Sequence, residues 1–363
     1  MSATDRIRYA IIGSGMMGHE HMRNIALLGD AVVAAVSDPD EGMRASAQAL
    51  AGEGCRAFRD HRDLIAADPV DAYVIASPNH THAAIMRDVL ATGKPILVEK
   101  PLGISVEECR AIIAAAAGRG PVWVAMEYRY MPPMQRLMEE LRAGAAGRAW
   151  MISIREHRFP FLRKVGDWNR FAENTGGTLV EKCCHFFDLM RLLAGAEAKR
   201  VYASGGMDVN FLDERYRGRT PDILDNVFVV VDFENGVRAM LDLCMFAEGS
   251  YWQEQVSVTG DRGRIDALVP GPARFSVDGQ ERSSEIVISP RDTKIERRET
   301  VDVDHKVLAA GDHHGSTFFQ HRKFADLVRH GGAPEVSLDD GLKAVTIGAA
   351  AEESARTGRA VEL

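Results

Sequence analysis

A glycine-rich turn stands between an apolar run and a helix-like segment near the start of the chain. The run Ile7–Ile12 has the length and composition of a buried strand. The turn after it reads Gly13-Ser14-Gly15-Met16-Met17-Gly18, and a helix-like pattern continues from residue 16 to residue 28. This G-x-G-x-x-G spacing allows a tight turn and lets the backbone approach a pyrophosphate, whose charge lies at the helix N-terminus. The order strand, glycine turn, helix therefore predicts the start of a dinucleotide-binding domain.

Four further apolar runs of strand length alternate with helix-like segments in the first third of the chain. The runs cover residues 31–36, 72–76, 96–98 and 122–126, and the helix-like segments cover 41–51, 81–92 and 105–117. Near-continuous apolar runs are typical of strands buried on both faces of a parallel sheet. Regular alternation of strand and helix indicates a doubly wound α/β sheet. We predict a Rossmann domain over residues 1–126.

The rest of the chain, residues 127–363, has a different pattern. Strand-like runs lie at 150–154, 225–233, 237–243, 255–259 and 285–289, and helix-like segments lie at 132–143, 318–328 and 338–355. Asn235-Gly236 between two of these runs is a strong hairpin signal. We predict a second, α+β domain with a largely antiparallel open sheet. A length of 363 residues agrees with two domains, because a single core usually stops growing at about 250–300 residues.

Charge and composition exclude several classes of protein. Lys plus Arg is 44 against 52 for Asp plus Glu, a net charge of −8, so a nucleic-acid or anionic-membrane partner is not expected. No apolar run approaches the ~20 residues of a membrane span, and the N-terminus lacks a signal-peptide pattern, so we expect a cytoplasmic protein. An odd number of cysteines without C-x-x-C spacing predicts buried free thiols and no metal site. The cysteines are Cys55, Cys109, Cys183, Cys184 and Cys244.

Polar residues after the predicted parallel strands form the candidate cofactor site. Asp38 lies 20 residues after Gly18, where a carboxylate can bind the adenosine ribose hydroxyls. A carboxylate there also repels a 2′-phosphate, so we predict NAD and not NADP. Ligands of such sheets bind outside the carboxyl ends of the strands, where the turn at residues 77–79 also falls. The predicted cofactor-binding residues are Gly13, Gly15, Met16, Met17, Gly18, Asp38, Ser77, Pro78, Asn79, His82, Glu99 and Lys100.

Two clusters carry candidate catalytic groups. Glu99-Lys100-Pro101 follows a buried strand, and Lys100 could hydrogen-bond a substrate hydroxyl and ease removal of its proton; a solvated loop lysine is the alternative. In the second domain, Glu181, His185 and Asp188 fall at i, i+4 and i+7 of a predicted helix that is otherwise apolar. Such a stripe on a buried helix needs either polar partners or a wet cleft; the alternative is that it is simply the solvent face of the helix.

In these motifs the sequence resembles the Gfo/Idh/MocA oxidoreductase family over nearly its whole length. The marks are the turn 13–18 followed by His21, Ser77-Pro78-Asn79, Glu99-Lys100-Pro101, Gly176-Gly177 followed by Glu181 and His185, and the stretch 337–362. The resemblance implies an NAD(P)-dependent enzyme acting on sugars or polyols, with the histidine as acid/base, the lysine assisting, and often a cis peptide before Pro101. It also implies a substrate pocket in the second domain and a dimer or tetramer contact on the open sheet face.

The chain departs from the family pattern at two positions. The family usually has Asp where this chain has Glu181, and an uncharged residue where it has Lys182. The longer carboxylate either orients His185 or pairs with Lys182 and leaves the imidazole free. The predicted catalytic residues are His185, Lys100 and Glu181.

The segment 155–170 suggests a substrate class. It contains Arg155, Arg158, Arg163, Lys164, Arg170 and Trp168 against only Glu156 and Asp167. Such a loop could clamp an anionic sugar, although a solvated surface of alternating charge is the alternative. His313 and His314 could also reach the substrate. The predicted substrate-binding residues are Lys100, Tyr128, Arg129, Arg158, Trp168, Lys182 and His185.

Three functions are compatible with these motifs. The first is an NAD-dependent dehydrogenase that transfers a hydride between nicotinamide and a hydroxyl-bearing carbon of a sugar, sugar acid, polyol or cyclitol. The second is a glycoside hydrolase that uses retained NAD for transient oxidation, elimination, water addition and reduction. The third is a non-catalytic sensor of dinucleotide and sugar, which the presence of Lys100 and His185 disfavours. We expect a homodimer or homotetramer.

Overall fold

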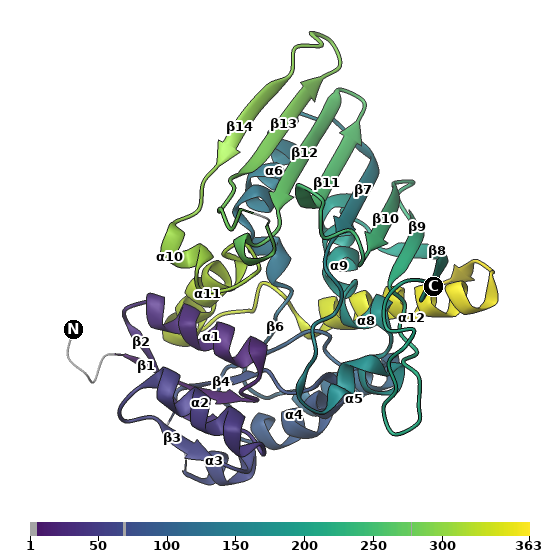
Figure 1. Cartoon of the computed structure of the whole chain (residues 1–363). Helices are drawn as coiled ribbons and strands as arrows, with labels where there is room; N and C mark the ends of the chain where they lie inside the picture. Colours follow the sequence, from purple (N-terminus) through teal and green to yellow (C-terminus); the bar gives the residue numbers. More distant parts are fainter. Residues whose placement is uncertain (1–5, 68–69, 277) are drawn as a thin grey trace.

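A computed structural model describes residues 6–67, 70–276 and 278–363, and it contains two sheets (Figure 1). The first sheet has six parallel strands in the order β3-β2-β1-β4-β5-β6. Its strands are β1 (Ile7–Ile12), β2 (Ala31–Ser37), β3 (Arg56–Phe58), β4 (Ala72–Ile75), β5 (Ile96–Val98) and β6 (Val122–Val124). Its helices are α1 (Met16–Leu27), α2 (Glu41–Ala51), α3 (His61–Ala67), α4 (His82–Leu90) and α5 (Val106–Ala116). The predicted Rossmann fold is confirmed. The sequence analysis missed β3 and α3, since β3 is only three residues long and not fully buried.

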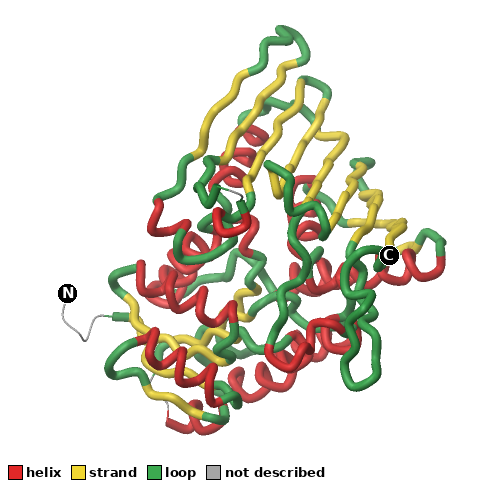
Figure 2. The backbone as a smooth tube through the Cα atoms, in the orientation of Figure 1, coloured by secondary structure: helices red, strands yellow, loops and turns green. Residues whose placement is uncertain are grey.

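The second sheet has nine strands in the order β14-β13-β12-β11-β7-β10-β9-β8-β15 (Figure 2). The strands are β7 (Ala149–His157), β8 (Ala198–Gly206), β9 (Asn226–Phe233), β10 (Arg238–Cys244), β11 (Trp252–Gly260), β12 (Gly263–Pro270), β13 (Ser284–Pro290), β14 (Arg297–Val301) and β15 (Val361–Glu362). Among the described strands, β7 and β10 pair in parallel and the other neighbours pair antiparallel. The predicted antiparallel sheet and the hairpin β9–β10 are confirmed.

Helices cover one face of the second sheet and leave the other open (Figure 1). Alternate residues of β9, such as Val229 and Val231, are buried under the helices, whereas Phe228 and Val230 between them are exposed. The helices of this half are α6 (Pro132–Arg142), α7 (Ala172–Thr175), α8 (Thr178–Glu181), α9 (Cys184–Ala194), α10 (His305–Leu308), α11 (Ser316–His330) and α12 (Leu338–Thr357).

The end of the chain returns to the first domain. Phe324 of α11 and Val345 of α12 belong to the same buried core as the parallel strands, and the Val124 amide donates to the Val336 carbonyl at 3.2 Å. Residue 126 therefore divides the two domains along the sequence only. In the folded chain, α11 and part of α12 pack on the first sheet. This return brings residues about 300 positions apart into contact at the junction.

The cysteines and helices agree with two further expectations. All five cysteines are free; four are buried and Cys244 is half-buried. No helix within the described ranges is both long and apolar enough to cross a bilayer.

Candidate active site at the domain junction

The glycine turn has room for no side chain at two of its positions. Gly13 has a φ of +94°, and a Cβ there would lie 2.5 Å from the Ser77 amide nitrogen. A Cβ on Gly18 would lie 2.2 Å from the Gly13 carbonyl oxygen. Only glycine fits positions this close to other backbone. The turn is thereby packed against the 77–79 turn at the carboxyl edge of the sheet, as the sequence predicted.

Asp38 is anchored beside the glycine turn. Its carboxylate accepts hydrogen bonds from the backbone amides of Ser14 at 2.7 Å and Asp40 at 2.9 Å. The Ser14 hydroxyl, in the glycine turn, and the Asn79 side-chain amide, in the 77–79 turn, are buried. Neither has a hydrogen-bond partner within the described part of the chain. Buried polar groups rarely stay unsatisfied in a working protein, so these atoms are candidates for contact with a bound ligand.

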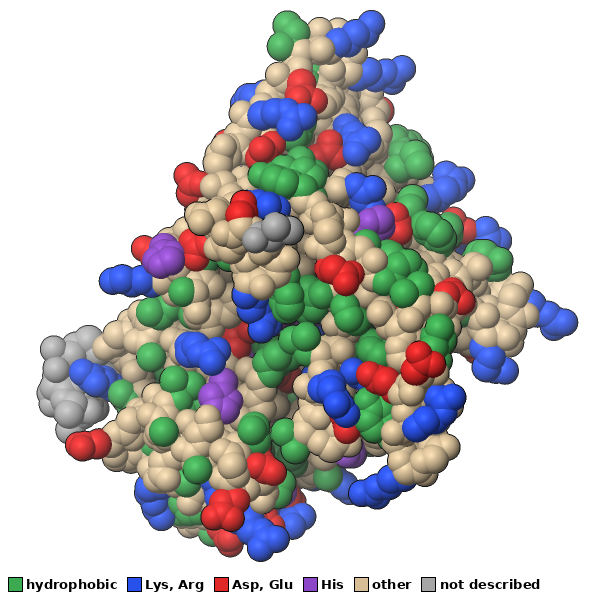
Figure 3. All heavy atoms as spheres, in the orientation of Figure 1, with side chains coloured by type: hydrophobic (Ala, Val, Ile, Leu, Met, Phe, Trp, Pro, Cys, Tyr) green, Lys and Arg blue, Asp and Glu red, His purple; other side chains and the backbone are tan. Residues whose placement is uncertain are grey.

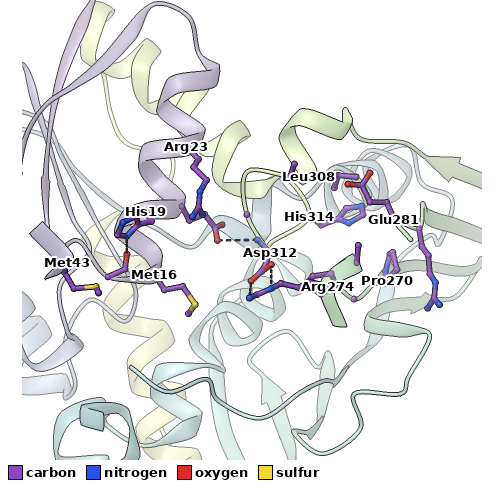
Figure 4. Close-up of a pocket in the computed structure, with 18 residues that line it drawn as sticks. Met16, His19, Arg23, Met43, Pro270, Arg274, Glu281, Leu308, Asp312 and His314 are labelled. Atoms are coloured by element: carbon purple, nitrogen blue, oxygen red, sulfur yellow. Dashed lines mark hydrogen bonds and ion pairs between the residues drawn. The ribbon is translucent and has the colours of Figure 1, made fainter. Parts of the chain in front are cut away.

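A cleft of about 570 Å³ runs along the glycine turn and α1 (Figure 4). Gly15 and Met16 line it on the first domain, so the N-terminal amides of α1 open onto it. Loops of the second domain line the other side, where Asp312 pairs with Arg274 (Figure 4). A helix N-terminus on such a cleft suits a phosphate group.

Lys100 leaves β5 and reaches across to the second domain. The Lys100–Pro101 peptide is cis, as the family resemblance implied. The Lys100 ammonium donates to the Glu181 carbonyl at 3.2 Å. Burial opposes the charge, but the neighbouring Cys184, Glu99 and Glu181 together hold the pKa of Lys100 above its ordinary value. Lys100 is therefore a half-buried cation at the junction, held by the second domain, and not a freely solvated loop residue.

His185 lies in the first turn of α9, buried beside Lys100. Its exposed fraction is 1%, and its Nδ1 has no hydrogen-bond partner among the described residues. Its ring stacks on Tyr128, with centroids 4.2 Å apart and planes 6° apart. Burial, and then the charges of Lys100 and Lys182, hold the pKa of His185 well below its ordinary value. The imidazole is therefore neutral near pH 7, the state that can accept a proton.

Neither arrangement expected for Glu181 and Lys182 occurs. Glu181 pairs with Lys164 at 3.1 Å, whereas Lys182 pairs with Glu156 at 2.9 Å. The physical reason is a break in the helix: α8 ends at Glu181 and α9 begins at Cys184, so the two side chains point to different neighbours. The prediction of one continuous helical stripe is therefore wrong, as is its alternative of a solvent face, because all three stripe residues are buried.

Three predicted contact residues have other partners. The Arg129 guanidinium is held by Asp188 and the Glu335 carbonyl, away from His185. Both ring nitrogens of His82 face backbone carbonyls, those of Pro101 and Ser77, and its side chain is fully buried. Glu99 is buried and accepts from the His21 ring at 2.9 Å. Each of these side chains thus has partners within the protein, and its contact with a ligand stays a prediction.

The basic segment 155–170 is largely neutralised by carboxylates. Arg163 pairs with Asp167 at 3.2 Å, and Arg170 pairs with Glu214 at 2.8 Å. Arg158 lies over the Phe159 ring and 3.6 Å from Glu156. Most of the positive charge that an anion clamp would need is therefore already paired with carboxylates. The Lys164 ammonium lies 4.4 Å from the centroid of the Trp168 ring, and the same ring contacts His80 of the first domain. These contacts place the segment over the junction.

The sequence analysis missed a buried acidic cluster beside this site. The Thr317 hydroxyl lies 2.7 Å from Glu20 and 2.6 Å from Glu127, within hydrogen-bond distance of both, and His313 lies 2.8 Å from Glu20 and 3.5 Å from Glu127. By spacing, Glu20, Glu127 and His313 could hold a cation. They also neutralise one another, because burial is outweighed by the carboxylates that raise the pKa of His313 to about 9. His313, singled out in the sequence, lies near the Tyr128 ring, with centroids 6.1 Å apart, but no local pattern pointed to its partners.

Comparison with known proteins agrees with this geometry. Two family models match, described as "Oxidoreductase family, NAD-binding Rossmann fold" over residues 7–128 and "Oxidoreductase family, C-terminal alpha/beta domain" over residues 139–363. The chain is 31% identical to an inositol 2-dehydrogenase of Saccharopolyspora erythraea over 275 residues, which covers 75% of this chain and 76% of that one. It is 35% identical to the rhizopine catabolism protein MocA of Rhizobium meliloti, but only over 53% of this chain and 58% of that protein.

Solved structures share the fold. A levoglucosan dehydrogenase in complex with NADH and levoglucosan superposes with a TM-score of 0.81 at 21% identity, with 99% of both chains covered. A probable dehydrogenase from Thermotoga maritima gives 0.76 at 23% identity, with 98% of both chains covered. At these identities the likeness establishes the architecture of both sheets.

Proposed function

The chain belongs to the Gfo/Idh/MocA oxidoreductase family, and from that membership we propose that it is an NAD-dependent dehydrogenase of a neutral sugar, polyol or cyclitol. The family membership confirms the resemblance drawn from the sequence motifs, and the matched NAD-binding domain confirms the cofactor class. Relatives named inositol 2-dehydrogenase and levoglucosan dehydrogenase support the reaction class. None of the relatives reported above bears a glycosidase name, so the hydrolase alternative gains no support.

One observation carries the proposal: a half-buried lysine and a buried neutral histidine from different domains meet at one place. Lys100 from the carboxyl edge of the first sheet binds the backbone of Glu181, one turn before His185. Oxidation of an alcohol requires a base for the hydroxyl proton and a positive charge beside the developing alkoxide. His185 is the proposed base and Lys100 the proposed cation.

The residues present fit the cofactor. The glycine turn and the N-terminus of α1 would hold the pyrophosphate, and Asp38 would hold the adenosine ribose. When bound, NAD supplies the hydride acceptor. His185 accepts the hydroxyl proton at a ring nitrogen, while the Lys100 ammonium lowers the energy of the alkoxide. His185 is shielded from water and Lys100 is partly shielded, which strengthens each interaction.

The charge pattern of the site favours an uncharged polyhydroxylated substrate over the anionic sugar considered from sequence. The cations Lys164 and Lys182 are paired with Glu181 and Glu156. Beyond those pairs, Oε2 of Glu156 and Oε2 of Glu181 are buried and have no hydrogen-bond partner within the described chain. Carboxylates accept hydrogen bonds and cannot donate them when ionised, so they suit hydroxyl groups and repel an anion.

Absorbance of reduced nicotinamide tests the function. The purified protein is mixed with NAD and a panel of inositols, levoglucosan, neutral sugars, uronates and glycosides. We expect growth of the signal with a neutral member of the panel. A preference for uronates would overturn the substrate class alone. Aglycone release that needs NAD but gives no net reduction would replace the dehydrogenase with the hydrolase.

Replacing Asp38 with alanine should weaken NAD binding by roughly 10–100-fold, because a charge-assisted hydrogen bond contributes about 1.5–3 kcal/mol. Binding of NADP should weaken less, since the repulsion of its 2′-phosphate disappears at the same time. Titration of both dinucleotides by calorimetry measures the ratio. Asp88→Ala, which alters a surface carboxylate paired with His61, is the control. An unchanged ratio of the two affinities would show that Asp38 does not choose the cofactor.

We also propose that the open sheet face joins copies of the chain. Tyr202, Val230 and Met240 align across β8, β9 and β10, and Phe228, 61% exposed, lies on the same face. Figure 3 shows hydrophobic side chains gathered with basic ones over this part of the sheet. Exposed apolar patches of this kind mark interaction surfaces. The cytoplasmic location predicted from the N-terminus stays a prediction.

Phe228→Arg should therefore dissociate the assembly into monomers, because it buries a charge in an apolar contact. Light scattering after size exclusion measures the mass of wild type and variant. Leu50→Arg, at an exposed apolar position on α2 of the first domain, should leave the mass unchanged. A monomeric wild type would contradict the proposal.

A further inference from the structure

Lys182 is a buried lysine at a position that the reaction itself does not account for. Its exposed fraction is 4%, and its ammonium lies 2.9 Å from Glu156 and donates to the Tyr128 hydroxyl at 2.7 Å. Burial lowers the pKa of Lys182, and Glu156 opposes that effect. A charge this deep is costly unless it is paired and hydrogen-bonded, and the Glu156 pair alone would serve stability. The second contact, to Tyr128, needs a separate explanation.

Tyr128 connects Lys182 to the proposed base. The Tyr128 ring lies flat on the His185 imidazole, at 4.2 Å and 6°, and the Lys182 nitrogen lies 4.9 Å from the centroid of the same ring. Burial, together with Glu156, raises the pKa of the Tyr128 phenol well above its ordinary value, so the hydroxyl stays protonated and accepts from Lys182. The Tyr128 ring thus has its hydroxyl end tied to Lys182 and its flat face on His185.

The charged and titratable groups that face His185 come from four other places in the fold. They are Lys100 after β5, Lys182 between α8 and α9, Arg158 after β7, and His313 before α11, and all four disfavour its protonated form. Glu254 of β11 acts one step further away, on Lys182 and Tyr128, and its pKa is raised to about 7 by burial and by Glu156. After Lys100, Lys182 is the strongest of these charges on the imidazole.

We propose that Lys182 is a positioning residue for His185: its ammonium, bonded to the Tyr128 hydroxyl, holds the Tyr128 ring flat against the imidazole. The charge of Lys182 also opposes protonation of that imidazole. This inference rests on the proposed function for its catalytic meaning, but its physical content concerns His185 in the free protein. The departure of this chain from its family at position 182 is then part of the site and not an incidental surface change.

Nitrogen NMR of the histidine rings tests the proposal without any substrate. The resonance of His185 is assigned by its loss in His185→Gln, and its titration is followed in the wild type and in Lys182→Met. We expect the midpoint to rise by about one pH unit in the variant, since a nearby like charge shifts a pKa by that order. Lys182→Arg, which keeps the charge, should leave the midpoint in place. Lys164→Met, which removes a neighbouring lysine that is not among the main charges acting on His185, is the control.

Kinetics separate a positioning role from a purely structural one. In Lys182→Met the acid limb of kcat/KM should move up with the His185 midpoint, and in Tyr128→Phe it should stay in place while kcat falls several-fold. Because Lys182→Met leaves Glu156 unpaired, a variant that fails to fold is replaced by Lys182→Met with Glu156→Gln, for which the same rise is expected. A His185 midpoint unchanged in a folded variant overturns the proposal. An inactive wild type overturns the proposed function and leaves the NMR result to decide this one.

Discussion

Replacing His185 with alanine should lower turnover by about 10²–10⁴-fold, the usual contribution of a positioned general base. The affinity for NAD should stay the same, because the cofactor residues lie on the first domain and His185 on the second. Steady-state kinetics and a separate dinucleotide titration measure the two effects. The matched control is His61→Ala, which removes a histidine paired with Asp88 on the first domain. Near-normal turnover in a folded His185→Ala protein would remove His185 from the mechanism.

The pH profile of the wild type follows from the same residue. The base must be unprotonated, and the pKa of His185 lies well below 6.5 because of burial and the charges of Lys100 and Lys182. For alcohol oxidation, kcat/KM should therefore stay level as the pH falls through 6.5 and should decline only below it. On the alkaline side Lys100 must stay charged, and its pKa is raised above 10.5. An acid limb at or above pH 6.5 would contradict the neutral, cation-flanked imidazole.

Replacing Lys100 with methionine should lower kcat by about 10²–10³-fold, the usual cost of losing one stabilising group of a developing oxyanion. Methionine keeps most of the side-chain volume, so the loss reports the charge and its hydrogen bond to Glu181. Lys100→Arg should recover only part of the rate, because a planar guanidinium does not replace a compact ammonium. Lys323→Met, at a surface lysine paired with Glu335, is the control. A large rise in KM with an unchanged kcat would assign Lys100 to binding alone.

Much of the fold was predictable because its signals are local. The run Ile7–Ile12, the glycine turn and the hairpin at Asn235-Gly236 are each specified within about ten residues, and each was confirmed. Short elements such as β3 were not predicted, since three residues are too few to show a periodic pattern. The return of α11 and α12 to the first core was not predicted, because it depends on packing between distant segments.

The candidate site was only partly predictable for the same reason. Lys100 and His185 were found because each follows a recognisable local pattern, and the structure brings their elements together. The break between α8 and α9 was not visible in the apolar pattern, and it redirected Glu181 to Lys164 and Lys182 to Glu156. The pair Glu20–His313 joins residues 293 positions apart, with no local signal at either end.

The sequence by itself determined the order of strands and helices, the glycine turn and the kinds of reactive side chain after each strand. These depend on burial periodicity and backbone conformation, which neighbouring residues set. Only the tertiary structure decided which carboxylate each buried cation faces and which ring lies on His185. A buried charge must find a partner through space, and that choice depends on how the two domains pack.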